Sequence, residues 1–219
     1  MLRGAGRQAH DQLVDTDHQR QRLVRQAFWL EWLTVAWMAV EAGVAIASGV
    51  AAHSISLVAF GLDSVIELAS AGVLIWRLSN ELRFGREVSE KAEWIARRIA
   101  SGLLFVLAAY VVTAAGWSLW RGEGGTFSWP GLTVAVLAMP IMLVLARRKL
   151  ALARELGSRA LRADAAESLA CLWLSFVVVI GLVAQLAVGA WWIDAMTSLA
   201  LVWFLVREGR EAWEDGEDD

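Results

Sequence analysis

The chain has 219 residues, of which 58% are apolar and 20% are charged, whereas soluble domains are about 45–50% apolar and about 25% charged. Together with long uncharged runs and a mean hydropathy of +0.50, this composition excludes a nucleic-acid-binding protein and a soluble enzyme and indicates a membrane protein. The one cysteine excludes a disulfide-stabilised secreted domain, and the net charge of −3 excludes little, because charges on the two sides of a membrane are sorted separately.

Six segments are apolar over the length of about 20 residues that a helix needs to cross a bilayer. In chain order they are 27–50, 55–76, 99–120, 127–146, 163–187 and 191–206, and the last of them is short. Residues 1–26 are polar and lack the apolar core of a signal peptide, so we expect an N-terminal tail that is not cleaved. We predict an all-α membrane protein with six transmembrane helices over 27–206, followed by a short acidic tail over 207–219.

Turn and capping residues mark several ends of these spans. The residues 51–54 leave room for only a tight hairpin between spans one and two. Pro130 suits the first turn of the fourth helix, Gly157 can end that helix, and Ser158 can cap the fifth. Asp194 lies near the outer start of the sixth helix, which we expect it to cap.

Lys and Arg residues give the orientation, because they are enriched on the cytoplasmic side of a membrane. Five precede span one, six lie between spans two and three, six lie between spans four and five, and two follow span six. Of the 20, only Arg121 falls in a loop on the opposite side. We therefore expect both termini to be cytoplasmic, with residues 147–162 forming a helical cytoplasmic segment.

Four acidic side chains lie well inside the predicted spans, namely Glu41, Asp63, Glu67 and Glu167. If all four were charged and faced lipid, they would cost on the order of 10 kcal/mol. We expect no Lys or Arg at the same depth to pair with them. They must therefore be protonated, face a wet cavity or bind a cation, which points to a function in ion binding.

The spacing of these residues favours a metal site. Asp63 and Glu67 are four residues apart and share one face of a helix, and Glu167 and Cys171 repeat that spacing in span five. Two helices that each offer two ligands can close a tetrahedral cage around one ion. Glu41, at the depth of Asp63, is the alternative fourth ligand. Two simpler interpretations stay open: Glu41 as a protonated hydrogen bond between helices, and Cys171 as a small apolar residue.

At these residues the sequence resembles the cation diffusion facilitator family, whose members are six-helix exporters of divalent metals. Span two contains Asp63-Ser64-Val65-Ile66-Glu67, which is similar to the family's second-helix pattern of two acidic residues. Arg162-Ala163-Asp164 is similar to the family's lead-in to the fifth helix, and Lys91-Ala92-Glu93 is similar to its loop before the third. The resemblance covers residues 35–206.

The chain departs from the family's pattern at three places. The family's fifth helix carries His and Asp four residues apart, where this chain has Glu167 and Cys171. The second acid of span two is Glu67 where Asp is usual, and the loop 83–90 has no histidine, so we expect no second metal site there. We also expect the family's cytoplasmic C-terminal domain to be absent, which would leave the transmembrane helices as the contact of any homodimer.

The resemblance implies that one divalent metal ion binds at mid-membrane between helices two and five and leaves the cell in exchange for protons. Metal ligands must be deprotonated, so proton binding and metal release are linked. Three carboxylates and one thiolate favour Zn²⁺, with Fe²⁺, Co²⁺, Cd²⁺ and Mn²⁺ as further candidates. The expected location is a bacterial inner membrane, and the expected partners are metal ions, protons and the lipid bilayer. We expect neither nucleic-acid binding nor enzymatic activity.

Two other functions fit the same residues. A membrane protein could bind metal as a sensor or partner subunit without transporting it. A proton-linked carrier could instead use Glu41, Asp63 and Glu67 for a small organic cation. The paired spacings and Cys171 favour a compact ion over an organic one.

Two further residues have candidate roles at the ends of the transport route. Asp164, near the cytoplasmic interface, could guide metal into the site, or it could cap a helix or pair with a local Arg. His53, at the outer mouth, could be a transient exit ligand or a solvated turn residue.

Overall fold

The computed structural model describes residues 2–84 and 90–214, which form six α-helices. They are α1 (Leu2–Ala52), α2 (Ile55–Phe84), α3 (Glu90–Arg121), α4 (Trp129–Leu156), α5 (Arg159–Val188) and α6 (Trp192–Glu214). The described residues contain no strand, and the prediction of an all-α fold is confirmed.

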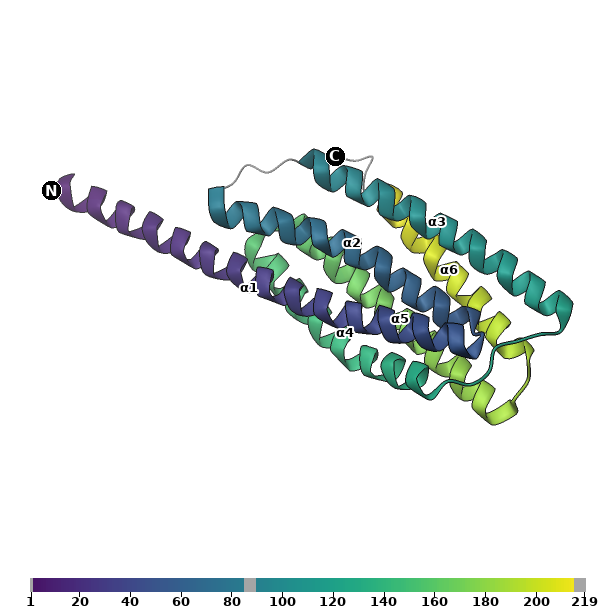
Figure 1. The fold of residues 1–219 in the computed structure, drawn as a ribbon. Coiled ribbons are helices and arrows are strands. Elements are labelled where there is room, and N and C mark those ends of the chain that lie inside the picture. The colour runs from purple at the N-terminus through teal and green to yellow at the C-terminus, as the bar shows by residue number, and fades with distance from the viewer. Residues whose placement is uncertain (1, 85–89, 215–219) are drawn as a thin grey trace.

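Consecutive helices run in opposite directions, and the connections α1–α2, α3–α4 and α5–α6 lie at one end of the bundle, which we call the hairpin end (Figure 1). The start of α1 at Leu2 and the end of α6 at Glu214 lie toward the other end, the terminal end, where the first part of α1 extends beyond the other helices (Figure 1). The residues predicted as a polar N-terminal tail therefore continue α1 from Leu2. Residues 207–214 of the predicted acidic tail belong to α6, and residues 215–219 lie outside the described part of the chain.

Five helices contain stretches that are long and apolar enough to cross a membrane, as expected of an integral membrane protein. These stretches are Gln19–Ala52, Ile55–Trp76, Arg98–Arg121, Trp129–Leu156 and Leu161–Val188. By the same measure α6 falls short, because Arg207, Glu208, Arg210 and Glu211 follow directly on its apolar part. It nevertheless packs against α3, α5 and α2 as a member of the bundle.

The predicted ends of α4 and α5 are confirmed. Pro130 lies in the first turn of α4, and Gly157 ends that helix in the left-handed region at a φ of 62°. The Ser158 side chain then caps α5 by accepting a hydrogen bond from the backbone N–H of Leu161 at 3.3 Å. The segment 147–162, predicted as cytoplasmic and helical, is therefore divided between the end of α4 and the start of α5.

Helices α1 and α2 approach closely at two glycines. A Cβ atom on Gly49 would lie 2.8 Å from the backbone nitrogen of Val58, and one on Gly61 would lie 2.9 Å from the backbone nitrogen of Ile46. Larger residues would push the two helices apart, and small residues are the usual means of close helix packing in membranes. This contact fixes α2, and with it Asp63, against α1.

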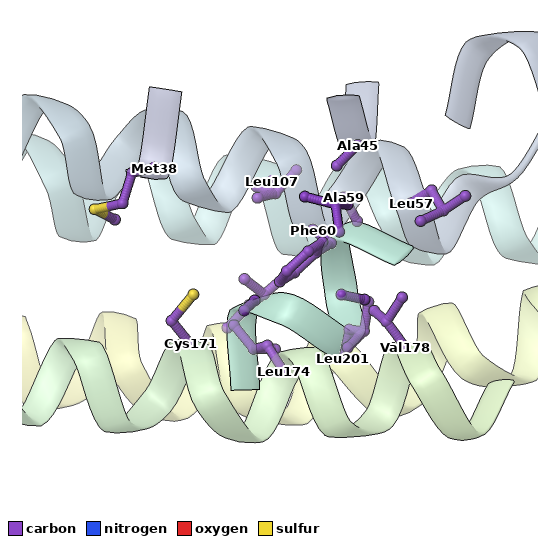
Figure 2. Packing of buried hydrophobic residues seen from close by; sticks show 14 of the residues in the cluster. Met38, Ala45, Leu57, Ala59, Phe60, Leu107, Cys171, Leu174, Val178 and Leu201 are labelled. Atoms are coloured by element: carbon purple, nitrogen blue, oxygen red, sulfur yellow. The ribbon is translucent and has the colours of Figure 1, made fainter. Parts of the chain in front are cut away.

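Apolar side chains from all six helices form the main core. Phe60 of α2 is 1% exposed and points toward Leu174 of α5 (Figure 2). Met142 of α4 and Leu201 of α6 belong to the same buried cluster. Because Leu57 and Phe60 precede Asp63 on α2, the part of this core around Phe60 forms an apolar layer between Asp63 and the hairpin end of the bundle.

Asp194 caps α2 rather than its own helix, so the expectation that it caps the sixth helix is wrong. Its Oδ2 accepts a hydrogen bond from the backbone N–H of Ile55 at 2.7 Å, and its Oδ1 accepts from the hydroxyls of Ser54 at 2.7 Å and Ser56 at 2.6 Å. The free N–H groups at a helix start attract a carboxylate. This buried carboxylate therefore ties the start of α6 to the start of α2.

Candidate metal site

Asp63 and Glu67, both predicted as metal ligands, lie on the buried face of α2. Their relative exposures are 1% and 6%. Neither carboxylate has a hydrogen-bond partner among the described residues. Since a buried polar group without a partner costs free energy, this pair needs either protons or a bound cation.

Glu208 of α6 lies beside this pair and was not identified from the sequence. One carboxylate oxygen from each of Asp63, Glu67 and Glu208 lies within 4.8 Å of the other two. The Oε2 atom of Glu208 is buried and, like the oxygens of the other two side chains, has no hydrogen-bond partner in the described part of the chain. Three carboxylates from two helices therefore converge on one point.

The reason that Glu208 was missed is the predicted end of the sixth span at residue 206, whereas the helix continues to Glu214. A signal for Glu208 was nevertheless present in the sequence. Leu201 and Leu205 are both 1% exposed, and Glu208 continues their spacing of three to four residues along one helix face. An acidic residue on the apolar stripe of a membrane helix is a candidate site residue.

A cavity of about 100 Å³ adjoins Glu67 and Glu208. Helices α2, α3, α5 and α6 line it with the residues Ile66, Glu67, Ser70, Ala100, Leu104, Ala163, Ala166, Glu167, Ala170, Glu208 and Glu211. Five of these residues are alanine or serine, and the lining comes from the middle of α2 and from the parts of α3, α5 and α6 nearest the terminal end. The cavity therefore lies between the carboxylates and the terminal end of the bundle.

Glu167, predicted as a ligand from α5, is half-buried in this cavity. The hydroxyl of Ser70 donates a hydrogen bond to its Oε1 at 3.5 Å. Glu167 therefore lines the same cavity as Glu67, so these two predicted ligands of helices two and five lie near each other. It does not join the compact group that Asp63, Glu67 and Glu208 form.

Glu41 and Cys171, the two alternatives for the fourth ligand, contact each other. The Cys171 thiol donates to Oε1 of Glu41 at 3.4 Å. Ser64 donates to the same oxygen at 2.7 Å, and the indole N–H of Trp37 donates to Oε2 at 2.8 Å. The carboxylate of Glu41 therefore accepts three hydrogen bonds and joins α1, α2 and α5.

Three charged side chains form a buried ion-pair group nearer the terminal end. Nζ of Lys149 in α4 lies 3.2 Å from Oε2 of Glu31 in α1 and 2.5 Å from Oδ2 of Asp164 in α5. Lys149 and Glu31 are fully buried. The prediction that Asp164 pairs with a local Arg has the wrong partner, and Lys149, predicted in a cytoplasmic segment, is enclosed by three helices. Glu31 was not singled out in the sequence, because it lies near the inner end of the first span.

His53 lies at the hairpin end of the bundle, in the connection between α1 and α2. It is exposed and adopts a φ of 52° in the turn between α1 and α2. Histidine is one of the residues that tolerate this region better than most. Its predicted role as an exit ligand stays a prediction.

Comparison with known sequences finds similarity to membrane proteins and to a cation efflux domain. The sequence profile of the cation efflux transmembrane domain matches residues 32–216. The chain is 28% identical over 158 residues to transmembrane protein 163 of Xenopus laevis, which is 69% of this chain and 53% of that protein. It is also 28% identical over 206 residues to the manganese efflux system protein MneS of Bacillus subtilis, which is 85% of this chain and 68% of that protein. The chain therefore spans about half the length of the first relative and about two thirds of the second.

Proposed function

This chain belongs to the cation efflux family, as its resemblance to the cation diffusion facilitators predicts, and from that premise we propose that it exports divalent metal ions by binding one ion at Asp63 and Glu67. The observation that carries this proposal is the pair of carboxylates itself. Both are buried, both lack a hydrogen-bond partner among the described residues, and both lie inside a helix bundle built to cross a membrane. Intramembrane acidic residues of this kind are expensive unless they bind or conduct a cation.

The arrangement around the pair supports entry of the ion from the terminal end. The cavity beside Glu67 lies on that side, whereas the apolar layer around Phe60 lies on the hairpin side. We propose that all six helices span the membrane of a bacterial cell, with both termini in the cytoplasm. The cavity is then the cytoplasmic entrance, and Glu167 in its wall attracts the incoming cation.

We propose Mn²⁺ as a substrate alongside the Zn²⁺-like ions that the sequence favoured. Carboxylate oxygens suit Mn²⁺, whereas the preference for Zn²⁺ rested on a thiolate ligand from Cys171. That thiol is engaged with Glu41. The name of the Bacillus subtilis relative, a manganese efflux system protein, points in the same direction.

Protons are the proposed counter-ions. The carboxylates must be ionised to bind the metal and are best neutralised by protons when the metal has left. Each transport cycle would therefore exchange the metal for protons taken up from the outer side. Metal export should then be faster when the outer solution is more acidic than the inner one.

A flux assay with purified protein in proteoliposomes tests the proposal. We expect the wild-type protein to carry Mn²⁺ and at least one of Zn²⁺, Co²⁺ and Cd²⁺ into vesicles that contain a metal-sensitive dye. Asp63→Asn and Glu67→Gln should each abolish the flux, because each removes one charged ligand. Glu123→Gln makes the same chemical change at an exposed position of the hairpin end and should retain it.

Two results would contradict the proposal. Undiminished flux in Asp63→Asn would mean that the ion passes by another route. Metal binding by the wild-type protein without flux of any metal in the panel would favour the sensor function instead.

A further inference from the structure

We propose that Glu208 is a third metal ligand, contributed by α6, and that it makes the site a three-carboxylate site for ions that prefer oxygen ligands. This inference rests on the proposed function and deepens it. The resemblance takes its ligands from helices two and five alone. With Glu208 as a ligand, α6 would be a third helix that contacts the bound ion.

The geometry of the three side chains matches one ion. Their ligand oxygens lie within 4.8 Å of one another. Metal–oxygen bonds of about 2.0–2.6 Å place two oxygens of one coordination sphere roughly 3–5 Å apart. The three carboxylates are therefore already gathered to the size of a single coordination sphere.

The missing hydrogen bonds point independently to a ligand. Both oxygens of Asp63, both oxygens of Glu67 and Oε2 of Glu208 have no donor among the described residues, although Asp63 and Glu67 are 99% and 94% buried by the exposures given above. Acidic side chains that only support a structure are normally satisfied by donors, as Glu41 and Asp194 are here, or paired with a cation, as Glu31 and Asp164 are with Lys149. A bound cation would compensate for the hydrogen bonds that these buried oxygens lack.

The arginines next to Glu208 do not neutralise it in this structure, because they are paired elsewhere. Arg207 contacts Glu211 at 2.7 Å and Arg210 contacts Glu214 at 3.7 Å, and both pairs are more than half exposed. Next to Glu208, the hydroxyl of Ser101 donates to the carbonyl of Gly209 at 2.6 Å and holds α6 against α3. The Glu208 side chain faces the cavity, and neither Arg207 nor Arg210 is paired with it.

The chemistry of the three ligands predicts the selectivity. Three carboxylates offer only hard oxygen donors, which suit Mn²⁺ better than they suit Cd²⁺. A soft donor placed at Glu208 should therefore change the metal ranking. A side chain that only supports the fold would not change it.

Equilibrium binding of Mn²⁺ to the purified full-length protein in nanodiscs tests the inference, with free Mn²⁺ measured by electron paramagnetic resonance. We expect Glu208→Gln to weaken Mn²⁺ binding by at least about tenfold, since even residues behind a ligand change metal affinity by about 10–100-fold. The matched control is Glu214→Gln, an exposed acidic residue of the same helix, which should bind as the wild type does. Asp63→Asn is measured in the same series.

A second variant keeps the test decisive if Glu208→Gln does not fold. Glu208→Cys should raise the affinity for Cd²⁺ relative to Mn²⁺ by at least about tenfold, because a thiolate is a soft ligand, whereas Glu214→Cys should leave the ratio unchanged. An unchanged ratio in Glu208→Cys, or unchanged Mn²⁺ binding in Glu208→Gln, would overturn the inference.

The outcome for Asp63→Asn separates this inference from the proposed function. If Asp63→Asn loses binding and Glu208→Gln does not, the site on α2 stands without Glu208. If neither variant changes binding, or if the wild type binds no divalent ion, both proposals fall.

Discussion

The thiol of Cys171 in α5 lies 3.4 Å from Oε1 of Glu41 in α1 and donates a hydrogen bond to it. Both side chains are fully buried. Two residues that the sequence presents as competing metal ligands are therefore partners of each other. The carboxylates that converge closely enough to share one ion are instead those of Asp63, Glu67 and Glu208.

Substitution of Cys171 tests whether its thiol is a donor or a ligand. We expect Cys171→Ser to keep the hydrogen bond to Glu41 and to leave the ranking of Mn²⁺, Zn²⁺ and Cd²⁺ flux unchanged. Cys171→Ala removes the donor with the loss of one heavy atom and should lower stability by about 1 kcal/mol, as judged by thermal unfolding in detergent. A selective loss of Cd²⁺ flux in Cys171→Ser would show that the thiolate binds the ion.

The ion-pair group of Lys149 predicts a large loss of stability. Lys149→Met leaves Glu31 and Asp164 buried without their cation, and removal of one partner of a buried pair costs about 3–5 kcal/mol. Arg148→Met removes a positive charge from an exposed position one residue earlier and is the control. Equal unfolding temperatures of the two variants would mean that the buried pairs add nothing.

Asp194 gives a smaller and graded prediction. Asp194→Ala removes the acceptor for the start of α2 and should cost about 1–3 kcal/mol, within the range of helix caps and charged hydrogen bonds. Asp194→Asn keeps one acceptor oxygen, so we expect an intermediate unfolding temperature. If Asp194→Ala unfolded at the wild-type temperature, the link between α6 and α2 would carry no stability.

The orientation of the bundle can be measured by cysteine labelling in a Cys171→Ser background. We expect cysteines at His53 and Glu123, which are exposed at the hairpin end, to react with an impermeant reagent added outside the cell. A cysteine at Glu214 should react only after the membrane is opened, because α6 returns the chain to the cytoplasm. Outside labelling of position 214 would show that α6 does not cross.

The fold was largely predictable because length and apolarity alone identify membrane helices. The segments around Gly157 and Ser158 were predictable to the residue, since a left-handed glycine and a capping serine have fixed positions at helix ends. The end of α6 was not, because its last two turns, residues 207–214, are rich in charged residues and resemble a solvated tail. Because the predicted helix ended at residue 206, Glu208 was not recognised as a site residue.

The site was predictable only in part, for a similar reason. Asp63 and Glu67 stand four apart on one helix, so their common face follows from the sequence. The residue on another helix that contacts each buried charge cannot be derived from the sequence. The rotation and depth of neighbouring helices are set by close contacts such as that at Gly61. For this reason no signal in the sequence indicated that Glu41 contacts Cys171 or that Asp164 pairs with Lys149.

The central claim is that the transported metal binds between α2 and its neighbours at Asp63 and Glu67. Anomalous X-ray diffraction from crystals soaked in Mn²⁺ locates the ion directly, without reference to transport activity. We predict one peak per chain within bonding distance of carboxylate oxygens of Asp63 and Glu67, and no such peak in crystals of Asp63→Asn. A peak beside Cys171 and Glu41, or an unchanged peak in Asp63→Asn, would contradict the claim.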